Sequence, residues 1–200
     1  VVCWTGDGGT YDIGVATLSA AAERNEDILY ICYDNEIYGN TGGQRSSATP
    51  EGVVTTTSPR GKTERKKDII AIMAAHRIPY AATLSLAHRE DFLRKVKFAA
   101  HTRGFRFLLM LSPCPTGWKS EAEDSVELIR DAVRCGIFPL YEVFDGSRYR
   151  INMERDGASV NAYCDRQRRY RRETLDASLI QARIDEQWRY LKAMAAAFPA

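Results

Sequence analysis

A carboxylate and an amide, each followed by glycines, occur within the first 44 residues of the chain. Asp7 lies in the segment 6–9, GDGG, and Asn35 opens the segment 35–44, NEIYGNTGGQ. Hard divalent cations take oxygen ligands, and backbone amides can approach a diphosphate closely where glycines leave room. These two segments therefore predict a divalent-metal and diphosphate site, in which Asp7 and Asn35 supply side-chain oxygens.

The residues before these segments have the patterns of strands that can deliver both ligands to one edge of a sheet. Residues 1–4 and 28–33 are apolar runs, and the small and apolar residues 14–22 between them are typical of a helix. Ligands of open α/β sheets bind beyond the carboxyl ends of the strands. We therefore expect Asp7 and Asn35 at the carboxyl edge of neighbouring strands.

The spacing of the two segments resembles the metal and diphosphate motif of thiamine diphosphate enzymes. Gly6-Asp7-Gly8 alone is also the sequence of an ordinary turn, but the second segment at this distance favours the cofactor site. The longer segment 33–50 resembles the β subunit of pyruvate:ferredoxin oxidoreductase and related 2-oxoacid oxidoreductases. This resemblance covers roughly the first three quarters of the chain and continues through residues 55–59, 66–69, 74–80, 112–118 and 136–142.

The resemblance implies a reaction and a set of cofactors. The reaction is the oxidative decarboxylation of a 2-oxoacid to acyl-CoA and CO2, with electrons passing through [4Fe-4S] clusters to ferredoxin, or through a flavin subunit to NAD. The thiamine-activating glutamate comes from another chain or domain, so none is assigned here. Mg2+ is expected on Asp7, Asn35 and the Ile37 carbonyl. Thiamine diphosphate is expected against Gly6, Asp7, Gly8, Gly9, Asn35, Ile37, Asn40, Thr41 and Gly42.

Asn40 is the candidate catalytic residue, because an amide can donate to developing negative charge without titrating. Pyruvate is the leading substrate. Gly39 and Gly43 beside Asn40 lack side-chain volume, which leaves a larger aromatic 2-oxoacid such as phenylglyoxylate as an alternative.

Cys114 stands between two prolines directly after an apolar run at 105–111, and proline on both sides fixes the local backbone. A buried thiol at a strand end is the simple interpretation. By resemblance, Cys114 corresponds to the last of four cysteine ligands of a [4Fe-4S] cluster, the other three lying upstream of the metal motif. Those three are absent, and the chain opens on Val1 close to the motif. We therefore expect a fragment of a longer β subunit.

Composition and charge argue against several other classes of function. The 200 residues are 44% hydrophobic and 27% charged with a net charge of +2, which predicts a soluble globular protein and gives no support for nucleic-acid binding. No membrane span or signal peptide is evident, so a cytoplasmic setting is the default expectation. The arginine-rich run 166–172 could suit RNA, but nearby acidic residues favour a solvated or subunit-contacting helix.

The expected partners are the other oxidoreductase subunits, of α, γ and δ type and including a ferredoxin-like one, together with CoA and the acceptor. Two other classes remain open. A non-oxidative thiamine diphosphate decarboxylase or carboligase would share the metal motif without needing Cys114. A non-catalytic assembly subunit that retains the fold would bind neither thiamine nor magnesium.

The rest of the chain alternates strand and helix patterns, which predicts an α/β fold with a mostly parallel open sheet and helices on both faces. Residues 1–140 would form the thiamine diphosphate-binding domain, and residues 141–200 a C-terminal hairpin and helical extension. In the helix expected over 90–102, the apolar residues should face the sheet and Lys95 and Lys97 should face water. Further helices are expected over 68–76, 125–135 and 177–197, strands over 80–84 and 105–111, and a hairpin over 142–152.

Overall fold

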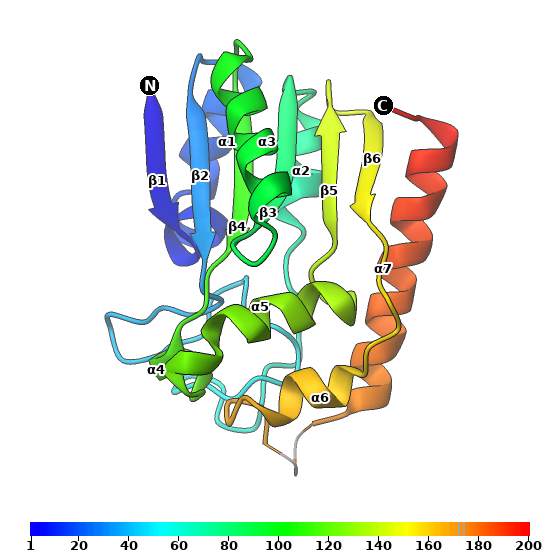
Figure 1. Ribbon diagram of the computed structural model, residues 1–200. Helices are drawn as coiled ribbons and strands as arrows, with labels where there is room; N and C mark the ends of the chain where they lie inside the picture. Colours follow the sequence, from blue (N-terminus) through cyan, green and yellow to red (C-terminus); the bar gives the residue numbers. More distant parts are fainter. Residues whose placement is uncertain (172, 174) are drawn as a thin grey trace.

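The computed structural model describes residues 1–171, 173 and 175–200, and its centre is a six-stranded sheet (Figure 1). The strand order is β1-β2-β4-β3-β5-β6. The first four strands in this order are parallel, β5 runs antiparallel to β3, and β6 runs antiparallel to β5. The expected mostly parallel sheet is therefore confirmed. The strands are β1 (Val2–Gly6), β2 (Leu29–Asp34), β3 (Tyr80–Ser85), β4 (Arg106–Leu111), β5 (Leu140–Phe144) and β6 (Arg148–Met153).

Helices cover both faces of this sheet. On one face, α1, α2 and α7 contribute to the larger apolar core, and on the other α3 packs over β3 and β4. None of the helices in the described part of the chain has the length and apolar character needed to cross a membrane. The helical elements are η1 (Gly8–Ile13), α1 (Val15–Glu23), α2 (Ile69–Ala75), α3 (Arg89–His101), α4 (Pro115–Trp118), η2 (Ala122–Asp124), α5 (Ser125–Arg134), α6 (Val160–Asp165) and α7 (Ala177–Ala197).

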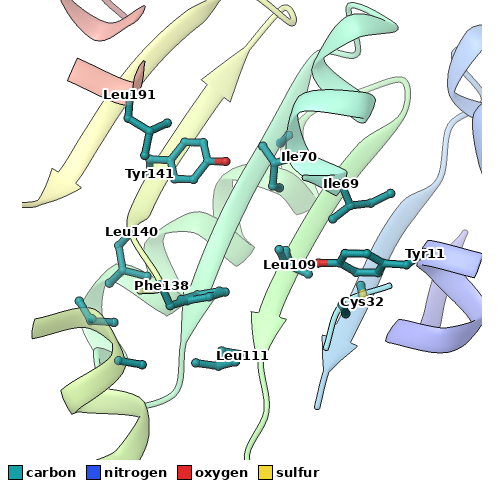
Figure 2. Close-up of a cluster of buried hydrophobic side chains, with 14 of the residues drawn as sticks. Tyr11, Cys32, Ile69, Ile70, Leu109, Leu111, Phe138, Leu140, Tyr141 and Leu191 are labelled. Atoms are coloured by element: carbon teal, nitrogen blue, oxygen red, sulfur yellow. The ribbon is translucent and has the colours of Figure 1, made fainter. Parts of the chain in front are cut away.

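The larger core holds the carboxyl edge of the sheet in place. Side chains from η1, β2, β4, β5 and α2 meet there, including Tyr11, Cys32, Ile69, Leu109 and Tyr141 (Figure 2). All five are buried.

Strand register brings the chemistry-bearing segments to one edge. Gly6 of β1 pairs with Tyr33 of β2, and Asp34 pairs with Leu111 of β4, so the chain leaves all three strands at the same level. The long connection 35–68, α4 and α5 all lie at this edge (Figure 1). The segments that follow β1, β2 and β4 therefore converge, as expected for the first two.

The expected faces of α3 are partly wrong. Lys95 is fully buried, with its ammonium 2.6 Å from Asp91 Oδ2 and donating to the Thr83 carbonyl at 2.9 Å, whereas Leu93 is 51% exposed. In a helix, positions 92, 96 and 99 form the stripe that packs on the sheet, and position 95 lies within that stripe while position 93 lies outside it. The prediction that Lys95 faces water followed from its charge. Its position in the helical repeat instead puts its side chain on the buried stripe.

The arginine-rich run also differs from expectation. Helix α6 ends at Asp165, and residues 166–170 form turns and an isolated bridge from Tyr170 to Val53. Arg168 is exposed as expected for a solvated residue, but Arg169 is fully buried. The part of this prediction that concerns residue 172 lies outside the described residues. The hairpin over 142–152 and the helix 177–197 are confirmed, and the hairpin extends the main sheet through β5.

Candidate functional site

Asp7 follows β1 and is buried at the carboxyl edge of the sheet, with 2% of its surface exposed. Its Oδ2 accepts a short hydrogen bond from the Ser46 hydroxyl. Burial, together with the negative charge of Asp34, raises the pKa of Asp7 to about 7. The site therefore holds a carboxylate whose negative charge the surrounding protein does not fully compensate.

Asn35 follows β2 and lies in a tight turn. Its Oδ1 accepts a hydrogen bond from the Ile37 amide at 3.2 Å, and its own carbonyl accepts one from the Trp118 indole at 2.8 Å. Among the described residues, no group donates to the Ile37 carbonyl. The residue between them, Glu36, has φ +66°, a left-handed conformation that non-glycine residues rarely adopt. The conformation of this turn therefore depends on contacts with other parts of the protein.

Tyr38 joins this turn to the segment that begins at Asp7. Its hydroxyl donates to the Gly8 carbonyl at 3.0 Å. A Cβ added to Gly8 would lie 2.1 Å from Tyr38 Cε1, so no larger residue fits there without displacing the ring. Glycine at position 8 is therefore required by the close approach of the 35–38 turn. Figure 1 shows the start of this connection below the end of β2.

Asn40, Thr41 and Gly42 form the exposed tip of the same loop. The base of the tip is closed by backbone hydrogen bonds between Tyr38 and Gln44 and between Gly43 and Tyr38, both at 3.0 Å. Among the described residues, the Asn40 side chain has no hydrogen-bond partner, so its amide is available to a ligand. Gly6 and Gly9 lie partly buried on either side of Asp7.

A buried network of ion pairs lies beneath the turn. The Lys66 ammonium is 2.6 Å from Asp34 Oδ2 and 2.8 Å from Glu36 Oε1, and Arg169 Nη2 is 2.7 Å from Glu36 Oε2. Tyr11 also donates to Asp34, at 3.1 Å. Although burial opposes ionisation of Glu36, Lys66 and Arg169 hold its pKa below the usual value. Both Asp34 and Glu36 are therefore partnered within the protein.

Neither Lys66 nor Arg169 is among the site residues that the sequence predicts. Lys66 lies in the segment 66–69, which is one of those that carry the resemblance, and this position is a weak indication that Lys66 belongs to the site. Arg169 lies 133 residues from Glu36 and within a run of similar arginines, so the sequence gave no local signal that this arginine is the buried one.

Cys114 precedes α4 and lies close to the turn. Its Sγ accepts a hydrogen bond from the Gly117 amide at 3.3 Å, and a Cβ added to Gly117 would lie 2.8 Å from Ile37 Cγ2. Within the residues that the structure describes, no three His, Cys, Asp or Glu side chains gather where they could bind a metal ion. One thiol cannot hold an iron-sulfur cluster, so the described residues do not by themselves fit that group.

The oxygen donors of Asp7 and of the 35–37 turn are of types that fit a hard divalent cation. They comprise a carboxylate, an amide oxygen and a backbone carbonyl, which are ligand types that Mg2+ accepts. A dication would supply the positive charge that the buried Asp7 lacks. The glycines beside Asp7 leave backbone amides that can approach the oxygens of a diphosphate.

Comparison with known proteins shows the family of the chain. Residues 1–110 match the family described as thiamine pyrophosphate enzyme, C-terminal TPP binding domain. The chain is 45% identical to the ketoisovalerate oxidoreductase subunit VorB of Pyrococcus abyssi, over 99% of this chain and 66% of that protein. It is 50% identical to the pyruvate synthase subunit PorB of Methanocaldococcus jannaschii, over 96% of this chain and 66% of that protein. The chain thus spans slightly less than two thirds of these relatives.

A solved structure shares the fold. It is a 2-oxoglutarate:ferredoxin oxidoreductase from Magnetococcus marinus with 2-oxoglutarate, coenzyme A and succinyl-CoA bound, which matches with a TM-score of 0.57 and 21% identity over 82% of this chain and 62% of that chain. The expected thiamine diphosphate-binding fold is therefore confirmed. The chain belongs to the thiamine pyrophosphate enzymes, whose C-terminal TPP-binding domain it contains, and it is similar along nearly its whole length to the VorB and PorB subunits.

Proposed function

We propose that this chain is the thiamine diphosphate-binding β-type subunit, or part of it, of a 2-oxoacid oxidoreductase. The observation that carries the proposal is the buried carboxylate of Asp7 beside the Asn35–Ile37 turn at the carboxyl edge of β1 and β2. The names of the relatives, ketoisovalerate oxidoreductase and pyruvate synthase, support this class of enzyme.

The proposed reaction converts a 2-oxoacid and CoA to acyl-CoA and CO2, and releases two electrons and one proton. The bond between the carboxylate and the keto carbon breaks, and a thioester bond to CoA forms. When bound, thiamine diphosphate supplies the nucleophile for the keto carbon and takes up the electron pair left by CO2. The electrons pass to an acceptor, ferredoxin or NAD, through other subunits.

In this proposal, residues of the chain itself bind the metal ion and the cofactor and orient the substrate. Asp7, Asn35 and the Ile37 carbonyl would hold Mg2+, and the backbone around Gly6, Gly8 and Gly9 and around Thr41 and Gly42 would approach the diphosphate cofactor. Asn40, at the exposed tip, donates its amide to negative charge that develops on the substrate oxygen.

Cys114 is proposed as one cluster ligand only in combination with thiols outside the present sequence, because the described residues supply no further ligands beside it. Partner subunits are proposed because the resemblance assigns the thiamine-activating glutamate to another chain or domain. The exposed apolar residues Val2 and Trp4 on the edge strand β1 suit contact with further polypeptide.

The test is to purify the native complex, measure its thiamine diphosphate, magnesium and iron content, and repeat the measurement with Asp7→Ala. Stoichiometric thiamine and iron, with thiamine lost in the variant, is the expected result. Thiamine without iron would favour a non-oxidative decarboxylase or carboligase, and absence of both would favour an assembly subunit. The matched variant Asp165→Ala alters an exposed aspartate at the end of α6 and should leave the thiamine content unchanged.

The substrate is proposed to be pyruvate or a branched 2-oxoacid, as in the names of the relatives, with phenylglyoxylate as the aromatic alternative. Initial rates with pyruvate, 2-ketoisovalerate and phenylglyoxylate distinguish them. A preference of several orders of magnitude for pyruvate would reject the idea that Gly39 and Gly43 admit an aromatic substrate.

A further inference from the structure

Arg169 is a buried cation at the base of the proposed metal site. It is 1% exposed, its Nη2 lies 2.7 Å from Glu36 Oε2, and its Nε donates to Gln167 at 2.8 Å. Glu36 is itself 5% exposed. A buried pair of this kind requires good geometry, because water screens neither charge. The orientation of the Glu36 side chain is therefore tied to Arg169.

The same guanidinium contacts the residue that holds Asn35. Its central carbon lies 4.2 Å from the centre of the Trp118 ring, and the fully buried Trp118 indole donates to the Asn35 carbonyl at 2.8 Å. The Arg169 amide also donates to the Trp118 carbonyl, at 3.3 Å. Through Trp118, Arg169 therefore also supports the backbone at Asn35.

These two contacts act on consecutive residues of a strained turn. Trp118 fixes the carbonyl of Asn35, and Arg169 fixes the side chain of Glu36, whose φ of +66° sets the direction in which the chain leaves toward Ile37. Asn35 and Ile37 are the residues on either side to which metal binding is assigned. A shift of Glu36 would therefore move the proposed ligands relative to each other and to Asp7.

We propose that Arg169 is a positioning residue for the metal and diphosphate site, acting through Glu36 and Trp118. This inference rests on the proposed function, because it assumes that Asp7, Asn35 and Ile37 bind a divalent cation. It adds a residue from the last fifth of the chain to a site whose proposed metal ligands all lie within the first 37 residues. Residues that orient metal ligands from behind typically change metal affinity about 10- to 100-fold when they are removed.

Metal affinity in the intact complex tests the proposal. After removal of divalent ions, Mn2+ is titrated in the presence of saturating thiamine diphosphate, and free and bound Mn2+ are measured by electron paramagnetic resonance. The variant is Arg169→Met, and the matched control is Arg168→Met, which changes the neighbouring arginine, whose side chain is 73% exposed. Arg169→Lys keeps the charge but loses the Nε hydrogen bond to Gln167 and the planar contact to Trp118.

We expect Arg169→Met to raise the Kd for Mn2+ at least tenfold and to change the spectrum of bound Mn2+. Arg168→Met should stay within about twofold of the wild type, and Arg169→Lys should fall between the two methionine variants. A folded Arg169→Met complex with the Kd and spectrum of Arg168→Met would overturn the proposal, because a residue needed only for stability would lower the melting temperature without altering the affinity.

Arg169→Met removes one of the two counter-charges of the buried Glu36 and leaves only Lys66. If this loss prevents folding, a second pair of variants tests the proposal. Glu36→Gln combined with Arg169→Met removes both charges, and Trp118→Phe removes the indole N–H while keeping an aromatic ring. Both should raise the Kd for Mn2+ at least tenfold, and wild-type affinity in both would overturn the proposal. A wild-type complex that binds neither Mn2+ nor thiamine diphosphate would contradict the proposed function itself, together with this inference.

Discussion

The ammonium of Lys66 lies 2.6 Å from Asp34 Oδ2, which makes it the cationic partner of a carboxylate with no exposed surface. Burial opposes the charged form of Lys66, but Asp34 and the nearby Glu36 hold its pKa above the usual value. The two carboxylates that flank Asn35 thus share one ammonium, which fixes the end of β2 to the connection 35–68.

Lys66→Met should be strongly destabilising, because it leaves Asp34 buried without its main counter-charge. Breaking a buried pair from one side typically costs about 3 to 5 kcal/mol. The free energy of unfolding from urea titration at pH 7 measures the effect. Adding Asp34→Asn should recover part of the loss, since the amide needs no counter-ion. An unchanged urea midpoint in the single variant would show that the pair contributes nothing.

Two lysines on α3 provide a matched comparison of burial. Lys95 is fully buried, bonded to Asp91 and to the Thr83 carbonyl, while Lys97 is exposed two residues later on the same helix. Lys95→Met should lower the free energy of unfolding by about 1 to 3 kcal/mol, because the buried carbonyl loses its donor. Lys97→Met should change it by less than about 0.5 kcal/mol. Equal effects in thermal denaturation would contradict the inward orientation of Lys95.

Glu142 gives a prediction about pH. It is buried on β5, and although burial opposes its ionisation, hydrogen bonds from Arg94, Tyr80 and Asn152 hold its pKa below the usual value. The folded state therefore binds a proton less readily than the unfolded state. This contribution to stability is fully present above the ordinary glutamate pKa and is lost as pH falls below about 4.5 through the folded value.

Glu142→Gln should accordingly destabilise the protein by about 1 to 3 kcal/mol at pH 7 and have a much smaller effect at pH 3. The urea midpoint measured at both pH values gives the comparison. Glu26→Gln, which alters an exposed ion pair with Arg24, should change the midpoint little at either pH. A penalty for Glu142→Gln that does not shrink in acid would show that the charge of Glu142 is not what stabilises the fold.

Gly8→Ala tests the contact between the two segments of the site. The added Cβ would lie 2.1 Å from the Tyr38 ring, so the ring and the 35–38 turn must move. Overpacking of this kind costs about 1 to 3 kcal/mol, and thiamine diphosphate binding with Mg2+ should weaken as well. Isothermal titration of the complex and urea unfolding measure the two effects. Adding Tyr38→Ala should restore stability in part, because it vacates the space.

Gly39→Ala is the comparison for this prediction. Among the described residues, an added Cβ at Gly39 meets no atom within 4 Å, so the free energy of unfolding should change by less than about 0.5 kcal/mol. If Gly8→Ala were as well tolerated as Gly39→Ala, Tyr38 could not be packed against Gly8 as described.

The sequence was sufficient to predict the strands, the carboxyl edge and the convergence of Asp7 with the Asn35 segment, because these depend on local apolar runs and glycine turns. The prediction that Lys95 faces water was wrong, because the position of Lys95 in the helical repeat buries its side chain. The burial of Arg169 was not predicted, because its contact with Glu36 arises from tertiary packing. The run 166–172 contains five arginines that look alike in the sequence, and among the described ones only the fold distinguishes the buried Arg169. The proposed roles of Asp7, Asn35, Ile37, Asn40 and Cys114 remain predictions for experiment.

The separation of 133 residues between Glu36 and Arg169 also affects the order in which the site can form during translation. At elongation rates of about 5 to 20 residues per second, Glu36 is synthesised roughly 7 to 27 seconds before Arg169. Until Arg169 leaves the ribosome, the nascent chain can assemble β1 and β2, but Glu36 must stay hydrated or rely on Lys66 alone. Completion of the proposed metal-binding turn is therefore a late event in biosynthesis, even though its proposed ligands are among the first residues of this sequence to be made.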